Sequence, residues 1–334
     1  MQDLVPLIEL TRGGTAECLH FGALAVADTA GRVVAHAGNP RWVTFTRSTL
    51  KPLQALPFLA ADGPRRFGYG REHLALLCAS HGGEPQHVER VQQMLEAAGL
   101  GVRALQCGCH VPGYVELTGA PAPAAYDERH HNCSGKHAGF LAWCVQHGHP
   151  THNYLAPAHP LQQAIRQAVA DVVGLAPGDL AAGTDGCSAP NYAMPLANLA
   201  RGFARLASGS ADPARGEQFA LLADAMTAHP DLVSGTGRND LAFMQAGRGD
   251  WVTKIGADGV QVVASRSRGQ ALALKISDGS KPALYAATVE ALDQLGWLDA
   301  RQREELRPWR GQAITNVKGT LVGERRPVFR LAVD

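Results

Sequence analysis

Two residues early in the chain, Ser48 and Lys51, have the types and the spacing that nucleophilic acyl transfer requires. A spacing of three places both side chains on one face of a helix that begins near Ser48. A serine hydroxyl becomes a good nucleophile when a base removes its proton, and lysine can be that base where burial and nearby cations lower its pKa. The helix N-terminus would also direct backbone N–H groups at a developing oxyanion. The alternative is an N-capping serine beside a solvated lysine.

Two later segments favour the catalytic interpretation. Ser80–Glu84 (SHGGE) follows the apolar run Leu74–Ala79, and its paired glycines predict a tight backbone site. Lys254 lies on an expected strand, two residues before Gly256. A serine-x-x-lysine, a second serine and then a lysine-x-glycine is the serial order of motifs in class A β-lactamases and penicillin-binding proteins. Lys275, on another expected strand, is the alternative second lysine.

The chain has seven cysteines, and their odd number and irregular spacing argue against a disulfide framework. Cys133 and Cys187 each lie in a Gly/Ser-rich turn and could ligate zinc, although the paired spacing of common zinc sites is missing. Two buried free thiols are the alternative. We expect Cys107 and Cys109 to be structural, and we expect the adjacent pair His130 and His131 to lie in an exposed turn.

The composition is that of an ordinary globular protein. The chain has 334 residues, 46% of them hydrophobic and 18% charged, and its formal net charge is +1 without a long basic run. Nucleic acid and anionic membrane surfaces are therefore not expected partners. Residues 1–10 lack a basic signal region, and no apolar stretch approaches the ~20 residues of a membrane helix. With free thiols, these features predict a cytoplasmic protein.

Alternating, β-rich segments at both chain ends predict one antiparallel sheet around a helical middle. The expected strands are Leu4–Leu10, Glu17–Val26, Arg32–Ala37, Trp251–Ile255, Val260–Ser265, Ala271–Ile276, Ala313–Val317 and Val328–Val333. The expected helices are Thr49–Leu59, His87–Ala98, Lys136–His147, Pro160–Val173, Glu217–Ala228 and Ala283–Leu295. We therefore predict an α+β fold in one domain, residues 1–334, with residues 1–45 and 250–334 in the sheet and 46–249 mainly helical.

Taken together, the segments resemble the rhizobial-type, thermolabile class 3 L-asparaginases over nearly the whole chain. The matching segments are Arg47–Gln54, Ser80–Glu84, His131–His137, Thr184–Cys187 and Ser234–Arg238. This resemblance implies a fold like that of serine β-lactamases and penicillin-binding proteins. It also implies two serine–lysine tandems, one of Ser48 with Lys51 and the other of Ser80 with Lys254.

The resemblance further implies a Zn²⁺ site near the active centre, with Cys133, Lys136 and Cys187 as ligands and water completing the coordination. Lysine is an unusual zinc ligand, because its amine must be neutral to donate a lone pair. The family also implies a homodimer. The expected activity is the hydrolysis of L-asparagine to L-aspartate and ammonia by an amidohydrolase, with Ser48 attacking the amide.

The two charged ends of asparagine need a carboxylate and a cation. Asp185 is the candidate for the ammonium end, and Arg47 or His137 for the carboxylate. The alternatives are that Asp185 caps a turn and that Arg47 forms a surface ion pair. The threonine-containing segment Thr11–Thr15 echoes the loops of the classical bacterial asparaginases, but we interpret it as a hairpin turn.

Three other functions stay open from the sequence alone. The first is a glutaminase, and the second is another β-lactamase-like serine amidase, esterase or peptidase. The third belongs to a different class, a non-catalytic, zinc-stabilised protein that binds an amino acid. Two serine–lysine pairs without a clear structural purpose argue against the third.

Overall fold

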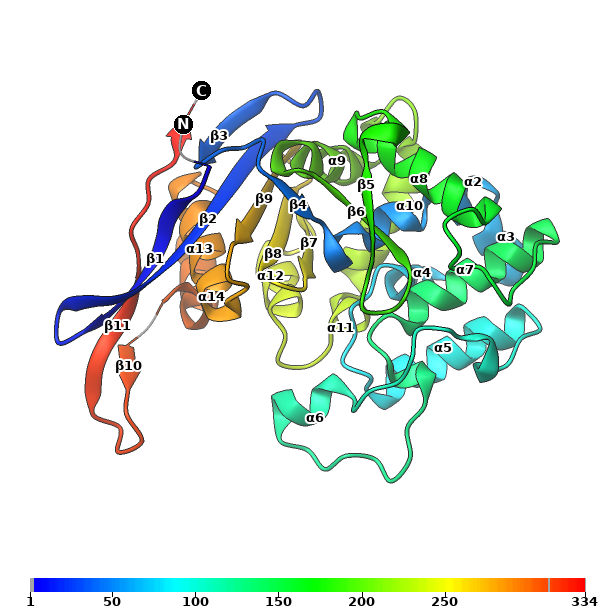
Figure 1. Cartoon of the computed structure of the whole chain (residues 1–334), viewed down its shortest axis with the longest axis horizontal. Helices are drawn as coiled ribbons and strands as arrows, with labels where there is room; N and C mark the ends of the chain where they lie inside the picture. Colours follow the sequence, from blue (N-terminus) through cyan, green and yellow to red (C-terminus); the bar gives the residue numbers. More distant parts are fainter. Residues whose placement is uncertain (1–2, 312, 334) are drawn as a thin grey trace.

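The computed structural model describes residues 3–311 and 313–333, and a long twisted antiparallel sheet dominates it (Figure 1). In spatial order its strands are β10 (Ala313–Thr315), β11 (Leu321–Pro327), β1 (Val5–Arg12), β2 (Thr15–Asp28), β9 (Gln270–Ile276), β8 (Val260–Ser265) and β7 (Trp251–Gly256). Strand β3 (Val33–Ala37) pairs with both β2 and β12 (Ala332–Val333). Both ends of the chain therefore build one sheet, as predicted.

The two faces of this sheet bury different side chains, because successive residues of a strand point in opposite directions. One face presents small residues, which are Ala23, Ala25 and Ala27 of β2 and Ala271 and Ala273 of β9. The other face presents larger ones, which are Leu24, Val26, Leu272, Leu274 and Ile276. The alanine face lets α9 (Leu196–Ser208) pack closely on β2 and β9. The larger side chains fill the space under α13 (Lys281–Gln294) and α14 (Ala300–Arg310).

The middle of the chain forms a helical lobe beside the sheet (Figure 1). Its α-helices are α1 (Lys51–Gln54), α2 (Leu56–Ala60), α3 (Gly63–Phe67), α4 (Arg71–Leu77), α5 (Pro85–Ala97), α6 (Gly113–Thr118), α7 (Ser134–His147), α8 (Pro160–Val173), α9, α10 (Gly216–Ala228), α11 (Pro230–Val233) and α12 (Asn239–Gly247). Short 3₁₀ helices lie at η1 (Arg47–Leu50), η2 (Val102–Ala104), η3 (Glu128–His130), η4 (Pro177–Asp179) and η5 (Gly209–Ala211). The predicted α+β class is thus confirmed.

Some predicted elements were wrong in detail. The expected helix Thr49–Leu59 is broken into η1, α1 and α2, because Pro52 and Pro57 cannot donate the hydrogen bonds of a continuous helix. The expected strand Val328–Val333 is reduced to Ala332–Val333. The chain leaves the sheet after β11, and Phe329 is buried against the α13 side of the molecule.

A second, small sheet went unpredicted. Its order is β4 (Val43–Phe45), β6 (Pro190–Pro195) and β5 (Ala181–Thr184). Strand β6 begins with proline and asparagine, which have low strand propensity, so the pairing with β4 and β5 arises from tertiary contacts. The sheet joins the segment before Ser48 to a segment nearly 150 residues further along the chain. Among the described residues, no helix has the length and apolar character needed to cross a bilayer.

Candidate active site

Two buried lysines converge on one serine hydroxyl. The Nζ atoms of Lys51 and Lys254 lie 3.0 Å and 2.9 Å from the Oγ of Ser80. Lys51 is 1% exposed and Lys254 is 0% exposed, so both amines are removed from water. Within the described residues, the Lys51 amine is bonded to Ser80 and not to Ser48. Ser80 therefore links the two lysines, whereas the sequence predicted two separate serine–lysine tandems.

Backbone oxygens hold both amines in place. Lys51 donates to the carbonyls of Ala79 and Asn132, the latter at 3.2 Å. Lys254 donates to the carbonyl of Ile255 at 3.0 Å. Buried donors need such partners, because an unpaired polar group in an apolar interior is costly. Ser80 itself follows α4, and its N–H donates to the carbonyl of Val233 at 2.9 Å.

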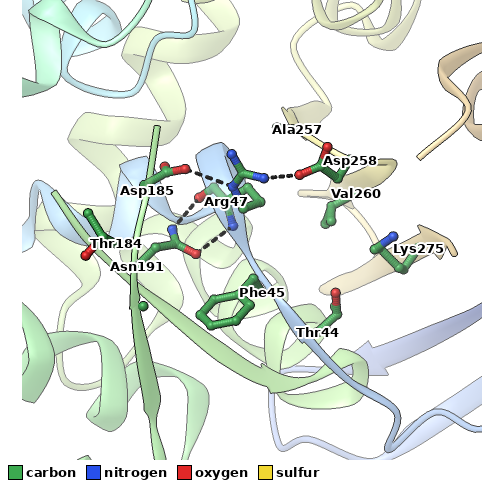
Figure 2. A pocket seen from close by; sticks show the side chains of 11 residues that line it. Thr44, Phe45, Arg47, Thr184, Asp185, Asn191, Ala257, Asp258, Val260 and Lys275 are labelled. Carbon is green, nitrogen blue, oxygen red and sulfur yellow. Dashed lines mark hydrogen bonds and ion pairs between the residues drawn. The ribbon is translucent and has the colours of Figure 1, made fainter. Parts of the chain in front are cut away.

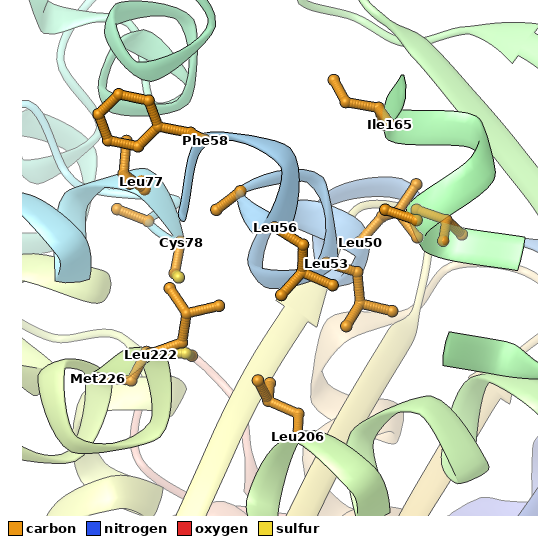
Figure 3. Packing of buried hydrophobic residues seen from close by; sticks show 14 of the residues in the cluster. Leu50, Leu53, Leu56, Phe58, Leu77, Cys78, Ile165, Leu206, Leu222 and Met226 are labelled. Atoms are coloured by element: carbon orange, nitrogen blue, oxygen red, sulfur yellow. The ribbon is translucent and has the colours of Figure 1, made fainter. Parts of the chain in front are cut away.

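The apolar core fixes the segment that carries Lys51. Figure 3 shows Leu50, Leu53 and Leu56 projecting from η1, α1 and α2 into a buried cluster. Their neighbours there are Ile165, Leu206, Leu222 and Met226. Each of the three leucines is 0% exposed. The burial anchors the backbone on both sides of Lys51, so the lysine side chain has a defined direction toward Ser80.

Burial lowers the basicity of both amines. It lowers the pKa of the Lys254 ammonium from its ordinary value to about 7, assisted by Lys51 and Arg238 and opposed by Asp240. Burial also lowers the pKa of Lys51, with Cys133 opposing the shift and Lys136 reinforcing it. A neutral lysine can accept the Ser80 proton while a protonated one donates to the same oxygen. The trio can therefore pass a proton from one amine to the other through Ser80.

Ser48 is less buried than this trio. It is half-buried, unlike Ser80, which is 3% exposed. It directly follows Arg47, which lines a cavity of about 350 Å³. The other lining residues are Thr44, Phe45, Gly183, Thr184, Asp185, Asn191, Ala257, Asp258, Val260 and Lys275 (Figure 2). Ser48 itself is not among the described residues that line the cavity, so its link to the cavity runs through Arg47.

Arg47 forms two ion pairs across the cavity (Figure 2). Its Nε donates to the carboxylate of Asp185 at 2.8 Å, and its Nη1 contacts the carboxylate of Asp258. Burial opposes the charge, but the two carboxylates outweigh it and raise the pKa of the guanidinium. Asp185 also accepts from the N–H of Gly186 at 2.9 Å. For these residues the sequence left turn capping, ion pairing and substrate binding open. The structure shows Asp185 bonded within its own turn and Arg47 in ion pairs.

The backbone of Arg47 is strained and is held by one buried amide. Its φ of 50° lies in the left-handed region, which is uncommon for a residue other than glycine. Asn191 accepts from the N–H of Arg47 and donates to its carbonyl, both at 2.9 Å. Gly256 allows the close approach of β7, since a Cβ there would lie 2.9 Å from the carbonyl oxygen of Thr46. Asn191 thus sets the direction of the chain as it enters Ser48.

The predicted metal ligands also come together. Lys136 Nζ donates to Cys187 Sγ at 3.0 Å, and the sulfurs of Cys133 and Cys187 share a hydrogen bond. The hydrogen bond from Cys133 and the Lys136 ammonium lower the pKa of Cys187, while the hydrogen bond to Cys187 and burial raise the pKa of Cys133. The cluster neighbours the lysine trio, because Cys133 is also hydrogen bonded to Lys51. A thiolate at Cys187 is therefore favoured.

His137 is placed with this sulfur cluster and is absent from the described lining of the cavity. Its Nδ1 is bonded to the hydroxyl of Tyr154 at 2.7 Å, and its buried Nε2 has no well-aligned hydrogen-bond partner among the described residues. Burial lowers the pKa of its imidazole to about 4. A neutral imidazole outside the cavity is poorly suited to bind a carboxylate.

Comparison with known proteins identifies the family of the chain. The model of the family described as L-asparaginase II matches residues 8–327. The chain belongs to the L-asparaginase II family. No curated protein matches it significantly. Among solved structures, a β-lactamase from Mycobacterium bovis is similar, with 15% sequence identity, a TM-score of 0.36, and coverage of 82% of this chain and 94% of that one.

Two further sequence expectations concern Lys275 and the adjacent histidines His130 and His131. Lys275 donates to the carbonyls of Ile276 and Ser277 and does not contact Ser80, so the geometry favours Lys254 as the second lysine. The expectation that His130 and His131 lie in an exposed turn was wrong, since His130 is half-buried in η3 and His131 is buried. His131 is 7% exposed, and its ring lies 4.5 Å from that of His110.

Sequence reasoning missed three polar residues, Asn191, Asp240 and Asp258. Asn191 lies in a strand that the sequence did not predict. Asp240 follows the recognised segment Ser234–Arg238, but nothing in its local pattern indicates that it is buried below Lys254. Asp258 has a φ of 56°, and the adjacent Gly259 signals its turn. Its pairing with Arg47 depends on tertiary structure.

We predict that Asn191→Ala destabilises the protein by about 1–3 kcal/mol, because it leaves two backbone groups of Arg47 without their partner. It should also lower catalytic efficiency, since Ser48 follows the released residue. Chemical denaturation and steady-state kinetics measure the two effects. Asn198→Ala is the matched control, because it removes one amide hydrogen bond to the carbonyl of Val173 away from the cavity. Equal kinetic losses in both variants would contradict the role of Asn191.

Proposed function

We propose that this protein hydrolyses the side-chain amide of L-asparagine to L-aspartate and ammonia, with Ser48 as the nucleophile. Membership of the L-asparaginase II family supports an amide substrate. The observation that carries the proposal is the convergence of Lys51 and Lys254 on Ser80, close to an Arg47-lined cavity. Two buried amines sharing one hydroxyl have a large desolvation cost and no evident role in folding. They are well suited to proton transfer.

The proposed reaction begins as neutral Lys51 turns from Ser80 to Ser48 and accepts the serine proton, while the serine oxygen attacks the amide carbon. The backbone N–H groups of Ser48 and Ala257 are the proposed donors to the oxyanion. The carbon–nitrogen bond then breaks, and the proton that Lys51 accepted is relayed through Ser80 and Lys254 to the leaving nitrogen, which departs as ammonia. A water molecule attacks the aspartyl ester, giving aspartate and restoring the Ser48 hydroxyl.

The cavity supplies candidates for both charged ends of the substrate. We assign the ammonium to Asp185 and the carboxylate to Arg47, whose guanidinium can bind a carboxylate through two parallel hydrogen bonds. We favour Arg47 over His137 because Arg47 lines the cavity and His137 does not. Substrate binding would replace part of the present pairing among Arg47, Asp185 and Asp258.

Replacing Ser48 with alanine should abolish ammonia release from asparagine, with a fall of about 10⁴-fold or more in kcat, while the fold is retained. The reason is that the proposed covalent intermediate requires this oxygen. Coupled ammonia detection measures the rate, and circular dichroism checks the fold. Ser208→Ala is the control, since that hydroxyl donates to the carbonyl of Arg205 at the end of α9.

Activity of Ser48→Ala close to that of the unmodified chain, together with inactive Ser80→Ala, would instead make Ser80 the nucleophile. A panel of asparagine, glutamine and nitrocefin separates the asparaginase from a glutaminase and from a β-lactamase-like amidase or esterase. Asparagine binding without ammonia release would support a non-catalytic binding protein.

We further propose that Cys133, Lys136 and Cys187 bind Zn²⁺. Cys187 contacts both Cys133 and Lys136, so two sulfurs and one amine provide a donor set, with a thiolate already favoured at Cys187. Within residues 3–311 and 313–333, no group of three or more histidine, cysteine, aspartate or glutamate side chains is arranged for a metal ion, so the amine would be a necessary ligand. Bound zinc would add a positive charge close to Lys51.

Zinc should copurify with the protein at about one ion per chain, and Cys187→Ala should lose it, because one thiolate and one amine rarely hold zinc. Elemental analysis by inductively coupled plasma mass spectrometry measures the content. Cys144→Ala is the control, since Cys144 is a buried free cysteine of α7 away from Lys136. Equal zinc content in all three proteins would refute the assignment.

We also propose, from the family resemblance, that the protein is a cytoplasmic homodimer. Size-exclusion chromatography with light scattering should give a mass of twice the 35.3 kDa chain. A monomer at concentrations that support full activity would contradict the dimer.

A further inference from the structure

A buried carboxylate lies below the second lysine. Asp240, in the first turn of α12, is 1% exposed, and its Oδ2 lies 3.5 Å from Lys254 Nζ. The same oxygen accepts from the N–H of Ile255 at 2.8 Å. Burying a carboxylate that has few hydrogen-bond donors costs free energy. The donors around Asp240 therefore indicate whether this position can hold a negative charge.

Three more contacts complete that environment. Oδ1 of Asp240 accepts from the hydroxyl of Thr253 at 3.1 Å and from the side-chain amide of Gln261 at 3.0 Å. Asn239 orients Gln261 by donating to its Oε1 at 2.7 Å. Thr253, Asn239 and Gln261 are all fully or almost fully buried. Both oxygens of Asp240 are thus held by groups that prefer a carboxylate.

Asp240 counteracts the groups that lower the pKa of Lys254. Burial lowers the pKa of Lys254, and so do Arg238 and the charged form of Lys51. Cys133 and Asp240 act in the opposite direction, and Asp240 has the larger effect. Because Asp240 also contacts the amine directly, it both fixes the direction of Lys254 and offsets the repulsion between two buried amines.

We propose that Asp240 is a positioning residue, which holds the Lys254 amine against Ser80 and supplies its counter-charge. The proposal deepens, and rests on, the proposed amide hydrolysis. Asp240 is absent from the described lining of the cavity, so its effect on substrate would pass through Lys254. Its loss should therefore change kcat more than KM.

The negative charge of Asp240 determines the direction in which the pKa of Lys254 should change in Asp240→Asn. Asp240→Asn keeps the size of the side chain and removes the negative charge, so the pKa of Lys254 should fall. If catalysis needs neutral Lys254, the acid limb of the kcat/KM profile must move to lower pH by the same amount. The plateau rate should also fall about 10-fold, because a less basic amine is a weaker proton acceptor.

The first measurement follows Lys254 directly, without relying on activity. The chain contains six lysines, so ¹³C-labelling of the lysine side chains gives a simple spectrum, and Lys254→Arg identifies the Lys254 signal. We expect its titration midpoint to fall by about one pH unit or more in Asp240→Asn. Asp240→Glu, which keeps the charge, should recover most of the midpoint and part of the rate.

Asp250→Asn is the matched control. Asp250 accepts from Ser265 and from the N–H of Ser267 at the far end of β7, with no lysine among these partners. It should leave both the Lys254 signal and the acid limb unchanged. If Asp240→Asn does not fold, Asp240→Glu carries the test, because the small part of the Lys254 midpoint that it does not recover must appear as an equal shift of the acid limb.

The outcomes separate this proposal from the proposed function. A Lys254 midpoint that is unchanged in both Asp240 variants would overturn the role of Asp240, even if the rate falls. A midpoint that moves without a shift of the acid limb would also overturn it, because Lys254 would then be uncoupled from the reaction. An unmodified chain that releases no ammonia from asparagine would refute the proposed function, while the titration would still report whether Asp240 controls Lys254.

Discussion

The structure depends on how two lysine amines are kept in an apolar interior on either side of a single serine hydroxyl. Each amine carries a desolvation cost that hydrogen bonds alone only partly offset. The protein supplies carbonyl oxygens to both amines and a carboxylate, Asp240, to Lys254. Lys51 instead lies near the sulfur cluster through Cys133. The two lysines therefore have different counter-charges, which is a common way of assigning different roles to similar groups.

This arrangement requires elements from distant parts of the chain to meet at fixed separations. Lys51 comes from the short helical segment that the leucine cluster anchors, and Lys254 comes from the edge strand β7 of the large sheet. Ser80 follows α4 in the helical lobe. The site thus lies where the lobe meets the sheet, so small displacements between them would separate the amines from the hydroxyl. Close packing of α9 on the alanine face of the sheet limits such displacements.

The strained entry into Ser48 is the second constraint. A left-handed residue directly before the nucleophile candidate would relax in an isolated peptide, because the conformation costs free energy. The side-chain amide of Asn191 stabilises this conformation, because it accepts from the N–H of Arg47 and donates to its carbonyl. The Arg47 side chain is simultaneously directed into the cavity and held by Asp185 and Asp258 (Figure 2). Arg47 therefore connects the cavity to the nucleophile candidate Ser48.

The sequence by itself determined the sheet-forming chain ends, most of the long helices and the residue types that surround the site. Those features have local signals, since periodicity and turn residues act over short stretches of chain. Tertiary structure alone decided that Lys51 faces Ser80, that His137 lies with the sulfurs, and that Asn191 and Asp240 support the site. Such pairings join residues up to 174 positions apart, as for Ser80 and Lys254, and their energies depend on burial, which no local pattern specifies.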